Sequence, residues 1–189
     1  MLFGKVTESV IFMGEVKVYY DERSESYDDI FDTLYFKVYD VITWKYLEPY
    51  IPTDPNALVL DAGGGTGHWA IRMARKGCKV VLMDASDGML KVAAGKVKEM
   101  GLQHRITIEK GDIAKTGYAT ETFDMILCEH TLFLFKEPDI LLRELHRVLK
   151  KKATLIISAQ NRYVQSLSSL SGKPSPDNVD RATKMLVSK

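Results

Sequence analysis

The sequence lacks the features that mark several large classes of protein. It has only two cysteines, Cys78 and Cys128. Both fall in or beside predicted strands without a metal-type ligand nearby, which is typical of reduced core thiols and not of a disulfide framework. No apolar stretch approaches the roughly 20 residues that a membrane span requires, and the first residues lack a signal peptide's apolar core and cleavage site. We therefore expect a cytoplasmic protein with no membrane span and no bound metal.

An excess of charge of either sign is also missing. The 26 basic residues nearly balance the 25 acidic ones, which leaves a net charge of +1, so we expect no nucleic-acid surface. The run Lys150–Lys152 is interpreted as a solvated helix end, where cations favour the helix dipole. With 189 residues, of which 46% are hydrophobic, the chain suits one domain with a full core.

What the chain does have is a regular alternation of short apolar runs and helical segments. Strands are predicted at 57–60, 79–83, 106–109, 123–128 and 153–158, and helices at 67–76, 87–100 and 138–150. Strands separated by helices favour a parallel sheet with right-handed crossovers, which binds ligands outside the carboxyl ends of its strands. We therefore predict an α/β fold with a Rossmann-like, doubly wound, mostly parallel sheet.

Three parts are predicted within this single domain. Residues 1–50 are expected to form an N-terminal lead and a helical lid, residues 51–162 the α/β core, and residues 163–189 a polar segment in which 178–188 could form a short helix. In the lid, a helix is predicted at 24–50, where several prolines end it. Its apolar stripe consists of Ile30, Leu34, Val38, Val41 and Ile42.

A glycine-rich junction between the first strand of the core and the next helix is the most informative stretch. Asp61 stands at the end of the strand, and four glycines follow, at Gly63, Gly64, Gly65 and Gly67. Glycines let the backbone adopt positive φ and approach a ligand closely, and the helix start offers unpaired N–H groups to an anionic group. Because Asp61 would repel a phosphate and attract an amine, the junction predicts a site for a cofactor that carries a cationic group.

A dinucleotide fingerprint can also be fitted to this junction. Gly65 to Ala70 matches its spacing, but the first glycine of that fingerprint should directly follow the strand, and here that residue is Gly63. An oxidoreductase is therefore the weaker interpretation.

Carboxylates also end the later strands of the predicted sheet. Asp84, Asp112 and Glu129 follow three of these strands, so we expect them on one rim together with Asp61. Asp84 is placed to accept hydrogen bonds from ribose hydroxyls. His130, beside Glu129, is the best candidate for a general base, with a structural histidine bonded to a loop carbonyl as the open alternative.

Several motifs resemble those of the class I S-adenosylmethionine-dependent methyltransferases, in particular the small-molecule enzymes of the ubiquinone and menaquinone biosynthesis type. The spacing Asp61-x-Gly63-x-Gly65-x-Gly67 resembles the first family motif, and the segment Asp84–Leu90 resembles its D-x-S-x-x-M-L segment. Gly111-Asp112-Ile113 and the R-V-L-K run at 147–150 are also similar to family segments. The resemblance covers roughly residues 18 to 162.

The resemblance implies S-adenosyl-L-methionine as the cofactor and assigns residues to it. It implies ribose binding by Asp84, packing of Met89 near the nucleoside, hydrogen bonding of Asp112 to the adenine amine, packing of Ile113 on the base, and a place for Glu129 near the methionyl part. Tyr20 and Tyr27 belong to a segment similar to one that closes over the cofactor. The full predicted set is Tyr20, Tyr27, Asp61, Gly63, Gly64, Gly65, Gly67, Asp84, Ala85, Met89, Asp112, Ile113 and Glu129.

The resemblance also implies the reaction, which is transfer of a methyl group to a small-molecule acceptor by direct displacement. The alternative is a catalytically silent S-adenosylmethionine-binding protein or a truncated fragment of such an enzyme, because the last two strands of the family fold cannot be found in the sequence. An uncovered sheet edge would then favour a homo-oligomer or coverage by residues 160–189.

Overall fold

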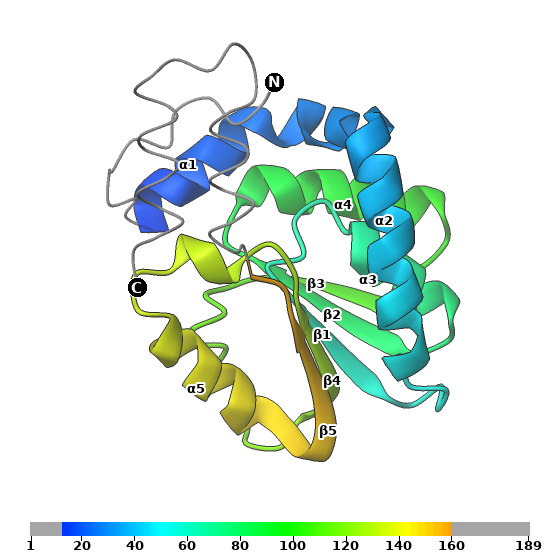
Figure 1. The fold of residues 1–189 in the computed structure, drawn as a ribbon, viewed down its shortest axis with the longest axis vertical. Helices are drawn as coiled ribbons and strands as arrows, with labels where there is room; N and C mark the ends of the chain where they lie inside the picture. The colour runs from blue at the N-terminus through cyan, green and yellow to red at the C-terminus, as the bar shows by residue number, and fades with distance from the viewer. Residues whose placement is uncertain (1–12, 160–189) are drawn as a thin grey trace, which may run out of the picture. The chain divides into compact units, whose positions relative to one another are not determined.

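A computed structural model of the protein describes residues 13–159. They contain one sheet of five strands in the order β3-β2-β1-β4-β5, and every neighbouring pair is parallel (Figure 1). The strands are β1 (Leu58–Ala62), β2 (Lys79–Asp84), β3 (Ile106–Lys110), β4 (Phe123–Cys128) and β5 (Leu149–Ile157). This confirms the predicted fold class. Because the strand order reverses between β1 and β4, the crevice for a ligand is expected at the carboxyl ends of those two strands.

Helices cover both faces of the sheet. They are α3 (His68–Arg75), α4 (Asp87–Glu99) and α5 (Pro138–Val148). Val59 of β1 packs in one buried cluster with side chains of α3 and α4, whereas its neighbour Leu60 packs in a second cluster with side chains of α5. Successive side chains of a strand point to opposite faces, so a strand covered on both faces is mostly apolar, as β1 and β4 are apart from Asp61 and Asp124.

The start of β5 differs from the prediction. The expected helix at 138–150 ends at Val148, and the strand begins at Leu149 instead of residue 153. Leu149 pairs with Phe123 of β4, and the register then shifts before Thr154 pairs with Met125. The shift includes Lys152 at a positive φ of 65°. Lys150 therefore lies in a strand, where it forms an ion pair with Asp124 at 2.8 Å, and not at a solvated helix end.

The predicted long lid helix is broken into several pieces. The structure contains α1 (Met13–Arg23), the 3-10 helix η1 (Ser24–Asp32), α2 (Leu34–Leu47) and the 3-10 turn η2 (Glu48–Tyr50). Thr33 interrupts the helix with an extended ψ of 146°, and its hydroxyl accepts a hydrogen bond from the N–H of Phe36. Threonine and serine side chains compete for backbone groups in this way, which favours a helix start over a continuous helix.

The apolar stripe predicted for the lid does not form its packed face. Leu34, Val38 and Val41 are 79%, 51% and 66% exposed, and Ile42 is exposed as well. The face of α2 that packs on the core carries Trp44, which lies against the first buried cluster, and Leu47, which is fully buried. Spacing alone therefore identified an apolar face of α2 but not the face that the core covers.

Asp40 fastens α2 to α3 through a charged contact. Its carboxylate accepts hydrogen bonds from Arg72 at 2.6 and 2.7 Å and lies 2.6 Å from Nε2 of His68. The Arg72 guanidinium stacks 4.1 Å over the ring of Trp44, and His68 stacks on Phe31. Burial alone would raise the pKa of Asp40, but the bonds from His68 and Arg72 hold it below its usual value. His68 therefore serves the packing of the lid.

The structure also shows the surroundings of the two cysteines. Cys78 and Cys128 are both free and fully buried. Across residues 13–159 there is no group of side chains that could hold a metal ion, and no helix has the length and apolarity needed to cross a membrane. The predicted polar segment at 163–189, including the possible helix at 178–188, lies outside the described residues.

Asp40→Ala should lower the free energy of unfolding by about 1–3 kcal/mol, because Arg72 and His68 would remain partly buried without their charged acceptor. Chemical denaturation measures this loss. Asp32→Ala is the matched control, since Asp32 is 90% exposed and its ion pair with Lys37 is long at 3.6 Å; it should change stability by less than about 0.5 kcal/mol. Equal effects of the two substitutions would contradict the fastening role of Asp40.

Candidate functional site

The glycine loop between β1 and α3 lies at the carboxyl end of the sheet. The N–H groups of Gly63 and Gly64 both donate to the carbonyl oxygen of Met83 in β2, at 2.8 and 3.2 Å. A side chain at Gly63 would overlap Thr131, which lies just after β4. At Gly65, with φ of 53°, a side chain would instead meet nothing within 4 Å. The loop is thus packed tightly against protein at its start and open at Gly65.

Asp61 lies in β1 directly against this loop. Its side chain is 1% exposed, and its Oδ2 atom has no hydrogen-bond partner among the described residues. A Cβ atom at Gly64 would come within 2.8 Å of that oxygen. Burial, followed by the charges of Glu129 and Asp84, raises the pKa of Asp61 to about 7. An unpaired buried carboxyl oxygen is costly unless a ligand group or a bridging water supplies a donor.

Asp84, the last residue of β2, connects the loop to the start of α4. Its carboxylate accepts hydrogen bonds from the N–H of Gly65 and from the N–H of Ser86, both at 2.9 Å. Burial raises its pKa against the opposing effect of these bonds. Each carboxylate oxygen has a second lone pair, so Asp84 can hold the loop and still accept from two further hydroxyl groups.

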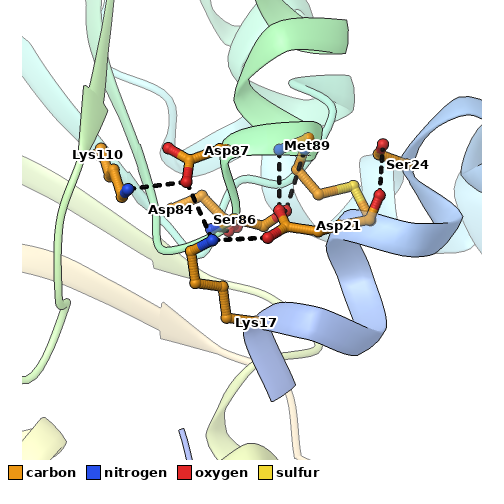
Figure 2. A network of polar contacts seen from close by, with 9 residues as sticks. Lys17, Asp21, Ser24, Asp84, Ser86, Asp87, Met89 and Lys110 are labelled. Carbon is orange, nitrogen blue, oxygen red and sulfur yellow. Dashed lines mark hydrogen bonds and ion pairs between the residues drawn. The ribbon is translucent and has the colours of Figure 1, made fainter. Parts of the chain in front are cut away.

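Asp21 of the lid caps the same helix start, a contact that the sequence analysis missed. Figure 2 shows its carboxylate beside Ser86 at the N-terminus of α4. It accepts from the Ser86 hydroxyl at 2.6 Å and from the N–H of Gly88 at 2.9 Å, and it pairs with Lys17 at 2.6 Å. The bonds from Lys17, Ser86 and Gly88 lower its pKa to about 2. The sequence signal is weak, because an acid in a polar segment is usually solvated.

A second lid carboxylate contacts the loop itself. Asp28 accepts from the hydroxyl of Thr66 at 2.6 Å and from Lys96 of α4 at 2.7 Å. The lid is therefore fastened on both sides of the junction between loop and helix. Neither contact follows from local sequence, since 38 residues separate Asp28 from Thr66.

Tyr20 and Tyr27 lie together on the inner side of the lid. Their ring centroids are 6.0 Å apart in an edge-on arrangement. Burial, then the nearby Tyr19 and Asp84, raises the pKa of Tyr20 to about 12. The pKa of Tyr27 is raised by burial first and then by Tyr20, Glu129 and Asp84. The structure thus brings both tyrosines within electrostatic reach of the acidic rim.

Glu129 and His130 follow β4 on the same rim. The hydroxyl of Tyr39 in α2 donates to Oε1 of Glu129 and also lies 2.9 Å from Nε2 of His130. His130 has a positive φ of 52°, which is uncommon for a residue with a side chain. The sequence did not point to Tyr39, because its partners are about 90 residues away.

The remaining predicted residues have different surroundings. Met89 and Ile113 are buried, with 2% and 4% exposure, and Ala85 is half-buried. Asp112 is exposed, and its carboxylate accepts from the N–H of Ala114 at 2.8 Å. Within residues 13–159 no hydrogen bond or ion pair joins Asp112 to the other predicted side chains. Trp69 is buried, and His104 and His146 are exposed.

Comparison with known proteins agrees with this geometry. A family model described as a methyltransferase domain matches residues 60–157, just over half of the 189 residues. The chain is 26% identical over 167 residues to a ubiquinone/menaquinone biosynthesis C-methyltransferase of Blochmanniella pennsylvanica, a match that covers 82% of this chain and 66% of that protein. It is 29% identical over 150 residues to a demethylmenaquinone methyltransferase of Bacteroides fragilis, with 76% and 59% covered. The chain thus spans between 59% and 66% of the length of these two curated relatives.

Solved structures share the fold. The cyclase SpnF superposes with a TM-score of 0.65 at 25% identity, covering 72% of this chain and 56% of that one. A putative S-adenosyl-L-methionine-dependent methyltransferase of Methanococcus maripaludis gives a TM-score of 0.64 at 22% identity, covering 88% and 82%. The match to the family model, together with the glycine loop and the acidic rim, shows that the chain belongs to the class I S-adenosylmethionine-dependent methyltransferase family. The cofactor of this family is S-adenosylmethionine.

Proposed function

We propose that the protein transfers a methyl group from S-adenosylmethionine to a small-molecule acceptor by direct displacement. The observation that carries this proposal is the buried Asp61, whose unpaired oxygen lies against the glycine loop on a rim that also holds Asp84 and Glu129. The charges of Asp84 and Glu129 help to raise the pKa of the buried Asp61. A group of three such carboxylates favours a ligand that brings positive charge. S-adenosylmethionine carries an ammonium group and a sulfonium, whereas a dinucleotide brings only phosphates to this position.

The residues present fit such a ligand. We assign the amino group to Asp61, through a direct or water-mediated contact, the ribose hydroxyls to Asp84, and the methionyl part to the neighbourhood of Glu129. The open face at Gly65 leaves room for the close approach of a ligand to the backbone. Further contacts are assigned to Gly63, Gly64, Gly67, Ala85 and Met89, and the adenine to Asp112 and Ile113.

Two tyrosines of the lid complete the assignment. The charge of Asp84 helps to raise the pKa of both Tyr20 and Tyr27, and the charge of Glu129 also helps to raise that of Tyr27. An aromatic face attracts cations, so the pair can favour a sulfonium held near the rim. When bound, the cofactor supplies an electrophilic methyl group on a good leaving group. The protein then mainly has to align the acceptor, and positioning of this kind can contribute about 7–11 kcal/mol.

The acceptor side of the site is assigned to His130. Its side chain is 36% exposed and adjoins Glu129, so it can act as a general base for an acceptor that must lose a proton. The relatives named for quinone biosynthesis support a small molecule as the acceptor. We assign the reaction to the cytoplasm, in keeping with two buried free thiols, and no role to nucleic acid.

The curated relatives are longer than this chain, so the activity of a complete enzyme is proposed here together with a cover for the edge of the sheet. Among residues 13–159, β5 is an edge strand of the sheet and its outer hydrogen-bonding groups need a partner. We propose that this edge is covered by residues 160–189, by further strands of a longer chain or by a second subunit.

Isothermal titration calorimetry tests the cofactor assignment directly. S-adenosylmethionine and S-adenosylhomocysteine should both bind, and NAD should not. A radiolabelled methyl group should then move to a phenol, quinol or amine acceptor in a panel of small molecules. Binding of NAD without heat from either S-adenosyl compound would refute the proposal, and cofactor binding without any methyl transfer would favour a silent binding protein.

Asp84→Asn should weaken the binding of both S-adenosyl compounds by about 1.5–3 kcal/mol, because the ribose hydroxyls would lose a charged acceptor. Asparagine keeps one oxygen for the N–H of Gly65, so the loop should stay in place. Asp87→Asn is the control, since Asp87 is 57% exposed and its ion pairs among residues 13–159 are with Lys17 and Lys110 (Figure 2). Equal loss in both variants, or none in Asp84→Asn, would place the ribose elsewhere.

Binding of S-adenosylmethionine should also release a proton from Asp61. The free protein holds this carboxyl largely protonated below its pKa of about 7, and an ammonium group nearby lowers that pKa. Affinity should therefore fall as the pH drops below about 7 and level off above it. Calorimetry at pH 6 in buffers of different ionisation enthalpy counts the protons, and Asp61→Asn should release nearly one fewer. Identical proton release by the wild-type protein and Asp61→Asn would mean that the protonation of Asp61 does not change when the ligand binds.

A further inference from the structure

Tyr39 is held between two partners of unequal chemistry. Its hydroxyl contacts Oε1 of Glu129 and lies 2.9 Å from Nε2 of His130. The rings of Tyr39 and His130 meet edge-on with their centroids 5.1 Å apart. Nε2 of His130 is also 3.3 Å from Oε1 of Glu129. Tyr39 is partly buried in α2, so the lid contributes the central member of this cluster.

The Tyr39 hydroxyl has one proton to donate, so it can be the donor in only one of its contacts with Glu129 and His130. An ionised carboxylate can only accept, so the single hydroxyl proton of Tyr39 must lie toward Glu129. Burial and then the bond to Glu129 raise the pKa of Tyr39, against the smaller lowering effects of Thr43 and Ser158, which keeps this proton on the phenol. The remaining lone pairs of the phenol oxygen can then only accept, and the contact with Nε2 needs a proton on that nitrogen. Nδ1 of His130 makes no hydrogen bond with any residue between 13 and 159.

The turn that carries His130 is fixed against the glycine loop. The N–H of His130 donates to the hydroxyl of Ser158 at 2.7 Å, and the hydroxyl of Thr131 donates to the carbonyl oxygen of Glu129 at 2.9 Å. Thr131 is 7% exposed and packs directly against Gly63. The imidazole therefore belongs to the same rigid corner as the loop, and its ring is 36% exposed.

We propose that Glu129 and Tyr39 are positioning residues that hold neutral His130 with its proton on Nε2, so that Nδ1 is the nitrogen that accepts the proton of the methyl acceptor. This inference rests on the proposed methyl transfer. It narrows the substrate class to molecules whose nucleophilic atom carries a weakly acidic proton, such as phenols, enols or protonated amines. It also means that docking of the lid completes the base, because Tyr39 comes from α2.

The step balances without any further reactant. The acceptor gives its proton to Nδ1, and the freed electron pair forms the bond to the methyl carbon. The electron pair of the bond between that carbon and sulfur stays on sulfur, which becomes a neutral thioether. The imidazolium then passes its extra proton to water.

Long-range proton–nitrogen NMR spectra of the 15N-labelled protein test the tautomer without any substrate. His130→Gln identifies the signals of His130 among the four histidines of the chain. We expect the neutral ring to carry its proton on Nε2. Glu129→Gln should move part of the population to Nδ1–H, because a neutral amide no longer forces the Tyr39 proton away from the ring. Tyr35→Phe is the control, since Tyr35 stacks on Tyr39 but is 61% exposed, and it should change nothing. A wild-type ring protonated on Nδ1, or an unchanged ring in Glu129→Gln, overturns the proposal.

A kinetic comparison tests the consequence for methyl transfer. Tyr39→Phe keeps the charge of Glu129 but removes the hydroxyl, so kcat should fall by about tenfold or more, since part of the contribution of a positioned base is lost. The KM for S-adenosylmethionine should change less than twofold. Unchanged kcat would overturn the positioning role. If the wild-type protein transfers no methyl group at all, the proposed function fails, while the spectra still decide the tautomer.

Discussion

The close approach of the glycine loop to its neighbours is the constraint on which the rest of the site depends. Two successive N–H groups, of Gly63 and Gly64, converge on one carbonyl oxygen of β2, and the next, of Gly65, reaches the carboxylate of Asp84. Side chains at Gly63 or Gly64 would overlap Thr131 or approach Asp61 and Leu82. Because the loop is held this tightly, the residues after β1, β2 and β4 form one corner, and a ligand meets groups whose positions are already set.

The electrostatics of this corner follow from its burial. Asp61, Asp84 and Glu129 lie close enough that the charges of Asp84 and Glu129 help to raise the pKa of Asp61, whose burial is the larger cause. Such an arrangement destabilises the empty site at neutral pH and favours a cationic ligand. The lid carboxylates Asp21 and Asp28 form ion pairs with Lys17 and Lys96 and fasten the lid. The charge of Asp21 also helps to raise the pKa of Asp84.

Most of the fold could be predicted from the sequence because its signals are local. The apolar runs and the glycines placed the sheet, and the largest displacement among its strands is at the start of β5, where Leu149 pairs with Phe123 across the sheet. The lid was predicted poorly for a physical reason. The break at Thr33 has a local cause, but the docking of the lid depends on Asp21, Asp28, Tyr39 and Asp40 meeting residues 28 to 90 positions away, and no local pattern records such partners. The clearest example is Tyr39, whose role appears only when α2 lies against the turn after β4.

The central claim is that one ligand is bound by the loop, the rim and the lid together. Amide hydrogen exchange with and without S-adenosylhomocysteine tests this most directly. The account predicts slower exchange at residues 61–67, 84–89 and 129–131, and in the same titration at residues 20–31 of the lid. Protection confined to the loop with an unchanged lid, or protection at neither, would contradict it.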